Sequence, residues 1–394
     1  MKILNTSKRR ARRAILASIL AASMAIAGCS GPNSDNDSKA DEKQSVKDVM
    51  GRTVEIPAHP ERLLFGGQRL LYTTALLDKE NPLENIVAWP DDLEQNDMAT
   101  YKKYREKFPD IANITKTGEV WDGSMSLEQA LQARPDVFVV SAGSFDAAKE
   151  AGLIEGLEKA GVPTVTVDYF IDPAKNTVPS VTLMGKLTGH TDEAKNYTDF
   201  YQEKLDRVQK RLKDSNQPAT DTFLWRAPGY FDCCSTFNKS NLATLVNEAG
   251  GNNLGDSMID TKQGQVSPES LAGKNPDVIV ATGADWSPDR SPVKGKKYVA
   301  LGYDEPADKA KQQLSEVVSS QAAVSQVDAV KNHRTYAMWH HFYDSPYNVI
   351  AIEWMAKAMH PELFGDLDPD ADMKTLHEQF LPVKYSGTFW TQLS

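Results

Sequence analysis

Aromatic and basic side chains gather in a few short segments that follow predicted strands. Together they offer large, flat, partly apolar surfaces and several hydrogen-bond donors, which predicts a large, flat and partly apolar ligand. Any single tryptophan among them could equally well belong to the core. The residues that we predict to bind this ligand in one cleft are Arg69, Trp89, Trp121, Trp225, Arg226, Tyr230, Trp286, His340, His341 and Tyr343.

The two arginines in this set would supply the positive charge that an anionic ligand requires. A guanidinium presents a planar set of N–H donors that matches carboxylate or catecholate oxygens. The chain has a net charge of −10, and −16 without its first 28 residues, which carry six basic side chains and no acidic one. Arg69 and Arg226 therefore predict a local anion site, although either could form an ordinary surface ion pair. So acidic a surface repels phosphate backbones and argues against binding of nucleic acid.

The run His340-His341-Phe342-Tyr343 could supply a direct ligand to a metal ion or to haem iron, through His340 or Tyr343. Neighbouring side chains of an extended segment point in opposite directions, so at most one of the two histidines would face a cleft. No HxxxH, HExxH or CxxC pattern occurs, so we expect no preformed zinc site. The GxSxG, GxGxxG and Walker motifs are absent too. We therefore predict a protein that is not an enzyme, with a surface-anchored hydrolase or metalloenzyme as the alternative.

The first 28 residues have the pattern of a signal peptide. Basic residues precede an apolar stretch from Ala14 to Ala27, which is too short for a stable membrane-spanning helix. The stretch ends in Ile26-Ala27-Gly28-Cys29, a lipobox-like sequence in which the Cys29 thiol would be diacylated, with palmitate for example, and the chain cut before it. Residues 29–45 are polar and predict a flexible tether. No run of 18 apolar residues occurs, so the lipid anchor is the predicted membrane contact.

Two further cysteines, Cys233 and Cys234, are adjacent in a predicted loop near Tyr230. With Cys29 lipidated, they are the remaining thiols in an oxidising compartment, and a bond between them is the available intramolecular disulfide. The sequence is compatible both with a disulfide that lines the cleft and with a pair of free thiols.

Short apolar segments alternate with helical patterns along the rest of the chain. The predicted strands are residues 62–65, 86–89, 137–141, 164–168, 223–225, 278–281 and 335–338. Buried strands between helices predict α/β lobes with parallel sheets, whose carboxyl-end loops would build the cleft. We also predict a helix that begins with Ser345 as its N-cap and Pro346 at its first position and runs to about Met359.

One long amphipathic helix is predicted midway along the chain. Its apolar side chains recur every three or four residues after an N-cap at Thr191, at Ala194, Tyr197, Tyr201, Leu205, Val208 and Leu212. We therefore predict an N-terminal lobe at 46–189, a connecting helix at 190–214 and a C-terminal lobe at 215–394. The fold class is α/β, with two Rossmann-like lobes joined by one long helix and a ligand cleft between them.

An internal repeat supports the division into two lobes. Ser126-Leu127-Glu128 followed by Pro135-Asp136-Val137 recurs as Ser267-Pro268-Glu269 followed by Pro276-Asp277-Val278, with a constant offset of 141 residues. Each copy predicts a helix capped by serine, with a glutamate in its first turn, and then a buried strand.

Several features taken together resemble those of a known family: the lipobox, the repeat, the central helix, Gly51-Arg52-Thr53-Val54-Glu55-Ile56-Pro57 and His59-Pro60-Glu61-Arg62. With them the chain resembles the substrate-binding lipoproteins of ABC importers for iron–siderophores, haem and cobalamin. The resemblance covers about residues 45–394. It implies an extracytoplasmic, lipid-anchored monomer on the outer face of the cytoplasmic membrane, without a cofactor and with little hinge motion. It further implies that Glu128 and Glu269 dock onto the permease subunits. From the residues alone, both glutamates could be simple helix caps.

We expect the ligand to be a ferric siderophore, an iron chelate. Haem and cobalamin are the alternatives within the same fold. A Soret band on addition of hemin, lost in His340 or Tyr343 variants, would identify the haem alternative.

Overall fold

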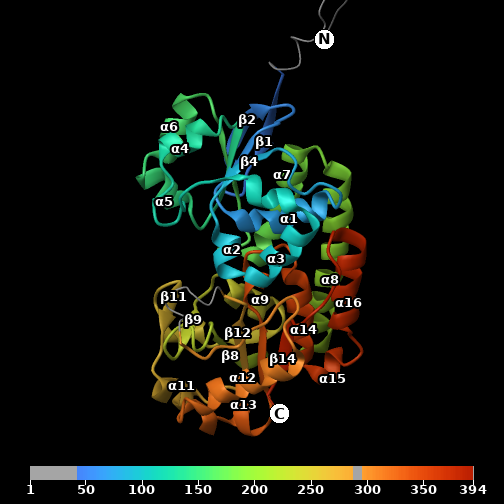
Figure 1. Cartoon of the computed structure of the whole chain (residues 1–394). Coiled ribbons are helices and arrows are strands. Elements are labelled where there is room, and N and C mark those ends of the chain that lie inside the picture. Colours follow the sequence, from blue (N-terminus) through green and yellow to red (C-terminus); the bar gives the residue numbers. More distant parts are fainter. Residues whose placement is uncertain (1–41, 287–294, 394) are drawn as a thin grey trace, which may run out of the picture. The chain divides into compact units, whose positions relative to one another are not determined.

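The computed structural model describes residues 42–286 and 295–393, which contain two five-stranded sheets (Figure 1). The predicted signal peptide, Cys29 and most of the predicted tether lie outside the described residues. The predicted flexible tether, residues 29–45, is too long at its C-terminal end, because residues 43–45 are part of a strand. This strand, β1 (Lys43–Lys47), pairs antiparallel with β2 (Thr53–Pro57). Arg52 closes the turn of this hairpin through an ion pair with Asp48 at 2.7 Å.

The first sheet contains parallel strands in the order β5-β4-β3-β6-β7. Their bounds are β3 (Leu63–Phe65), β4 (Ile86–Trp89), β5 (Thr115–Lys116), β6 (Val137–Ser141) and β7 (Thr164–Val167). On β6, Phe138 and Val140 pack under one layer of helices, while Val137 and Val139 pack under the other. Because both faces are covered, the strand is apolar throughout instead of alternating with polar residues.

Helices cover both faces of this sheet, and we call the assembly up to residue 189 the N-terminal lobe. One face is covered by α4 (Leu127–Gln132), α5 (Phe145–Glu150) and α6 (Leu153–Lys159), and the other by α1 (Leu71–Leu77) and α7 (Pro173–Thr188). The remaining elements of this lobe are η1 (Gln68–Leu70), α2 (Asp92–Asn96), α3 (Met98–Lys107) and η2 (Pro109–Asn113).

The second sheet has the order β10-β8-β12-β13-β14 and is parallel except for the pairing of β13 with β14. Its strands are β8 (Thr220–Trp225), β10 (Gly251–Asn253), β12 (Val278–Gly283), β13 (Thr335–Trp339) and β14 (Trp390–Gln392), and a separate pair is β9 (Ser235–Phe237) with β11 (Gln263–Gln265). The helices of this C-terminal lobe are α9 (Leu242–Glu248), α10 (Gly255–Met258), α11 (Pro268–Lys274), α12 (Ala307–Ser319), η3 (Val324–Gln326), α13 (Asp328–Lys331), η4 (His340–Tyr343), α14 (Asn348–Met359), α15 (Pro361–Phe364) and α16 (Pro369–Phe380). The predicted α/β class with parallel sheets is confirmed.

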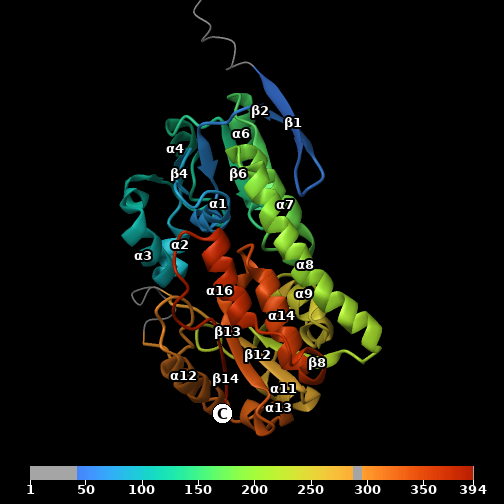
Figure 2. The ribbon, with the colours of Figure 1, turned by 90° about the vertical axis from the view of Figure 1, so that its right-hand side faces the viewer.

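The long helix α8 (Thr191–Ser215) packs against α7 of the N-terminal lobe and α14 of the C-terminal lobe (Figure 2). Its predicted apolar stripe is buried, except that Leu212 is partly buried. The helix begins at Thr191 itself, and His190 is the N-cap. Two hydroxyls fix α8 to the C-terminal lobe: Tyr201 donates to Asn348 Oδ1 at 2.7 Å, and Tyr197 donates to the Pro346 carbonyl. No helix among the described residues is long and apolar enough to span a membrane.

The predicted start of the following helix, with Ser345 as N-cap and Pro346 as its first residue, is wrong, because α14 begins two residues later, with Tyr347 as N-cap and Asn348 as its first residue. The Pro346 carbonyl would accept a helical hydrogen bond from Ile350, but it accepts the Tyr197 hydroxyl instead. The Ile350 N–H donates to Tyr347, and the Ser345 hydroxyl caps nothing. A tertiary contact with α8 therefore overrides the local capping signal.

Both copies of the sequence repeat form the predicted helix and strand. Ser126 caps α4 and Ser267 caps α11, each through a hydrogen bond from the backbone N–H three residues on. Glu128 and Glu269 lie in the first turns of these helices and are exposed. The repeated strands are β6 and β12, which lie within their respective sheets.

Candidate ligand-binding site

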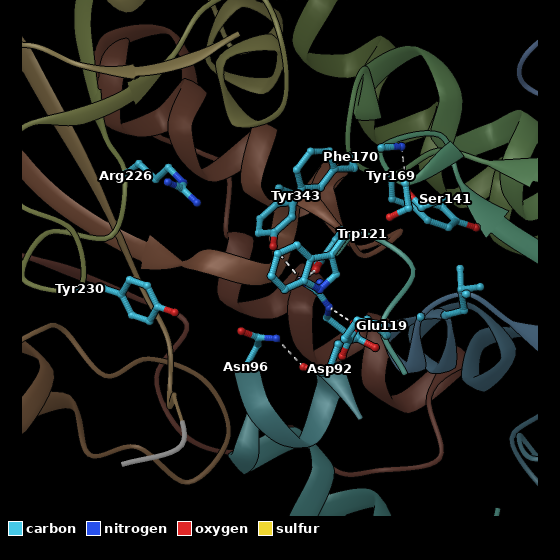
Figure 3. A pocket seen from close by; sticks show the side chains of 17 residues that line it. Asp92, Asn96, Glu119, Trp121, Ser141, Tyr169, Phe170, Arg226, Tyr230 and Tyr343 are labelled. Atoms are coloured by element: carbon cyan, nitrogen blue, oxygen red, sulfur yellow. Dashed lines mark hydrogen bonds and ion pairs between the residues drawn. The ribbon is translucent and has the colours of Figure 1, made fainter. Parts of the chain in front are cut away.

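A cavity of about 350 Å³ lies between the two lobes (Figure 3). Its wall is formed by segments that follow the carboxyl ends of β3, β4, β5, β6, β7, β8 and β13, where open α/β sheets bind ligands. The N-terminal lobe contributes Gly66, Gly67, Arg69, Leu70, Asp92, Asn96, Glu119, Trp121, Ser141, Gly143, Ser144, Tyr169 and Phe170, and the C-terminal lobe contributes Arg226, Tyr230, Tyr343 and Asp344.

Five of the ten residues predicted to bind ligand line this cavity: Arg69, Trp121, Arg226, Tyr230 and Tyr343. Trp121 stands out because 57% of its surface is exposed, although it directly follows the buried Val120. An exposed indole contributes little to the core, so its ring is available to stack on a ligand. Ligand contact by these five side chains stays a prediction.

The structure places the other five away from the cavity wall: Trp89, Trp225, Trp286, His340 and His341 are all buried. Trp286 packs behind the wall, 4.7 Å from the Tyr230 ring, and the His340 ring lies within hydrogen-bond distance of the Thr282 hydroxyl at 2.8 Å. Nε2 of His341 lies 2.9 Å from the Asn96 carbonyl. Large aromatic side chains at strand ends fill the core as readily as they line a cleft, and sequence alone does not separate the two outcomes.

Arg69 spans the cavity between the two lobes. Its guanidinium forms ion pairs with Asp92 of the N-terminal lobe and Asp344 of the C-terminal lobe, and Nη1 donates to the Tyr343 hydroxyl at 2.7 Å. Burial by itself would lower the pKa of Arg69, but Asp344, Tyr343 and Asp92 together raise it above its usual value. The charge of Arg69 is therefore already compensated within the protein.

Arg226 lies on the opposite wall and has no such partners. No carboxylate among the described residues forms an ion pair with it, and its Nε and Nη1 are buried without a hydrogen-bond acceptor. The guanidinium lies over the Phe231 ring, 3.8 Å from its centre, and the side chain points into the cavity (Figure 3). Burial lowers the pKa of Arg226 to about 10, so it remains protonated at neutral pH. It therefore offers a positive charge that the protein itself does not neutralise.

Glu119 places an unpaired carboxyl group on the N-terminal side of the cavity. Its backbone is tied into a tight turn, where its N–H donates to Ser124 Oγ at 2.8 Å and its carbonyl accepts the Met125 N–H at 3.0 Å. The carboxylate accepts no hydrogen bond from any described residue. Burial, followed by the nearby Asp92, raises the pKa of Glu119 to about 8.

Sequence reasoning did not single out several of these wall residues. We predicted ligand contact for Trp121 of the loop after β5 but assigned no role to the Glu119 carboxyl group, which lines the same wall. Phe170 is held by the Asp168 carboxylate, which accepts the backbone N–H groups of Phe170 and Ile171 at 2.8 and 2.7 Å. An aspartate directly after a strand is the local signal for such a turn. The Phe170 ring then meets Tyr343 of the other lobe edge to face.

The described residues contain no preformed metal-binding centre. No group of three or more His, Cys, Asp or Glu side chains among the described residues could hold a metal ion. Cys233 and Cys234 are joined by a disulfide, and Cys233 lines a second cavity of about 240 Å³ beside Trp225 instead of the site between the lobes.

A family model described as a periplasmic binding protein matches residues 84–339. The chain belongs to the periplasmic binding protein family. The uncharacterized ABC transporter substrate-binding lipoprotein YvrC of Bacillus subtilis is 23% identical over 90% of this chain and 99% of its own length. The iron(3+)-hydroxamate-binding protein YxeB of the same organism is 25% identical over 48% of this chain and 51% of its own length.

The fold of this periplasmic binding protein also matches solved structures. The TroA-like periplasmic binding protein FepB from Veillonella parvula superposes with a TM-score of 0.79 at 24% identity. The match covers 89% of this chain and 99% of that one. It establishes the arrangement of sheets and helices.

Proposed function

We propose that this protein captures a ferric siderophore in the cavity between its lobes and delivers it to the permease of an ABC importer. The observation that carries the proposal is the unpaired guanidinium of Arg226 inside a cavity that also presents Trp121 and Tyr230. Hydroxamate, catecholate and carboxylate oxygens around iron concentrate negative charge that a guanidinium can meet with several N–H donors. The similarity to an iron(3+)-hydroxamate-binding protein agrees with this ligand class.

The proportions of the cavity favour a compact chelate. About 350 Å³ lies at the lower end of the range for small-molecule sites. Haem would need a free axial ligand, whereas Tyr343 already accepts a hydrogen bond from Arg69, and burial raises the pKa of Tyr343 to about 12. His340 and His341 lie behind the wall. The geometry thus favours the siderophore over haem.

Delivery is assigned to the two exposed glutamates of the repeat. Glu128 on α4 and Glu269 on α11 belong to different lobes, and neither lines the cavity between the lobes. Figure 1 shows α4 and α11 on the same side of the ribbon, one in each lobe. Two fixed charges placed in this way could set the register of a permease across both lobes. Diacylation of Cys29 would keep the receptor at the outer face of the membrane.

Tryptophan-fluorescence titration and native mass spectrometry against ferric hydroxamates, catecholates and carboxylates, haem and cobalamin test the proposal. We expect a one-to-one complex with at least one ferric siderophore and weaker binding of the iron-free form. Exclusive binding of haem or cobalamin, or turnover of an ester or peptide substrate, would overturn it.

A further inference from the structure

The cavity has an unpaired guanidinium on one wall and an unpaired carboxyl group on the other. Arg226 of the C-terminal lobe faces in from one side, and Glu119 of the N-terminal lobe from the other (Figure 3). Neither side chain has an ion-pair partner among the described residues. In the empty protein the Arg226 charge is unpaired, and the pKa of about 8 keeps the Glu119 carboxyl group mostly protonated at neutral pH. A ligand with groups of both signs would pair with the guanidinium and favour the ionised carboxylate.

The other charges of the cavity wall are already paired. Arg69 is shared between Asp92 and Asp344, so it neither neutralises Glu119 fully nor remains free for a ligand. The Glu119 side chain also has no structural task, because its turn is held by backbone contacts to Ser124 and Met125. The carboxylate is therefore free to meet a group of the ligand.

We propose that Glu119 binds a protonated amine of the siderophore, while Arg226 meets its iron-bound oxygens. This inference rests on the proposed function and narrows the ligand to chelates that carry a cationic group at a distance from the metal. A ligand of this kind compensates both walls at once, whereas a purely anionic chelate would leave the carboxylate unpaired or place like charges together.

Burial is the main cause of the raised pKa of Glu119, and several charged groups around the carboxyl group modify it further. On its own wall these are Asp92 and Asp91 of the segment that begins α2, Asp122 of its own loop and the Arg69 guanidinium. The groups that line the other wall are Arg226, Tyr230, Tyr343 and Asp344. Burial and then Asp92 raise the pKa of Glu119 to about 8, and a bound cation favours the ionised form. Binding of an amine-bearing chelate should therefore release a proton and strengthen as pH rises from 6 to 8.

A linear ferric trihydroxamate with a terminal primary amine, and the same chelate with that amine acetylated, are the matched probes. We expect the wild-type protein to bind the amine form about tenfold more tightly at pH 8, as for a charge-assisted contact. In Glu119→Gln the two chelates should bind equally. The preference should grow from near one at pH 6 to about tenfold at pH 8, because the ionised fraction of a group with a pKa of about 8 rises over that interval. The amine itself stays protonated throughout.

Asp122→Asn is the control for a change in overall charge. Asp122 lies in the same loop, is exposed and does not line the cavity, so this variant should keep the preference for the amine. Equal binding of both chelates by the wild type, or an amine preference that survives in Glu119→Gln, overturns the inference and leaves the proposed function standing. If neither these probes nor any other ferric siderophore binds, the proposed function itself is wrong.

Discussion

Replacement of Arg226 by methionine tests the assignment of the anion site most directly. Methionine keeps an unbranched apolar stem and removes the charge, which has no counter-ion among the described residues. Hydrogen bonds to a charged group contribute about 1.5–3 kcal/mol each. Loss of one such contact with a ferric siderophore should raise Kd by about 10- to 150-fold.

The free energy of unfolding of Arg226→Met should rise slightly or stay unchanged, although its ligand affinity falls. Burial lowers the pKa of Arg226 to about 10, so the folded state disfavours the charged form relative to the unfolded chain. At neutral pH the charge therefore costs folding free energy, and its removal should recover some of that cost. Because the guanidinium is partly exposed and contacts the Phe231 ring, we expect a gain of no more than about 1 kcal/mol.

Arg69→Met is the matched comparison, because Arg69 lies in the same cavity but is paired. Its removal leaves Asp92 and Asp344 without their shared counter-charge, and breaking a buried ion pair costs about 3–5 kcal/mol. We expect a lower midpoint of urea unfolding for Arg69→Met and an unchanged or higher midpoint for Arg226→Met. Tryptophan quenching by the chelate gives the affinities. Wild-type affinity in Arg226→Met, together with normal stability in Arg69→Met, would refute the reasoning for both residues.

Three further predictions concern stacking, delivery and anchoring. Trp121→Ala should weaken binding about 2- to 10-fold through lost stacking area and leave the melting temperature unchanged, since the ring is exposed; a large drop in melting temperature would contradict this. Glu128→Gln combined with Glu269→Gln should keep ligand affinity within about twofold but reduce transport and stimulation of the importer's ATPase. In the single variants this defect should deepen with salt, and normal transport in the double variant would leave the repeat a purely architectural feature. Cys29→Ser should release the protein from the membrane fraction, as followed by immunoblot after fractionation; retention there would rule out the lipid anchor.

Local sequence patterns predicted the elements whose formation depends on near neighbours. The stripe from Ala194 to Leu212 predicted α8 almost to the residue, because apolar spacing of three and four is a property of the helix itself. The runs 86–89 and 137–141 predicted β4 and β6 with their observed bounds, since strands buried on both faces are apolar throughout. The 141-residue repeat likewise predicted the two capped helices and their strands.

Tertiary contacts decided the helix start and the burial of side chains where the local sequence pattern allowed more than one outcome. Ser345 and Pro346 form a standard helix start, yet α14 begins later because Tyr197 of α8 takes the Pro346 carbonyl. Trp89 is the last residue of β4 and Trp121 lies in the loop after β5 of the same lobe, but Trp89 is buried in the core and Trp121 is exposed in the cavity. The difference depends on what the rest of the chain packs against each ring.

The two arginines show most clearly what the sequence determined and what it did not. The sequence placed Arg69 and Arg226 after strands, and thus at the carboxyl-end edge of each lobe's sheet, where open α/β sheets bind ligands. It did not show that Asp344, 275 residues away, would neutralise Arg69 while no carboxylate of the described chain reaches Arg226. Partners so distant in sequence meet only when both sheets are folded and apposed. For this reason tertiary structure alone decided which positive charge remains for a ligand.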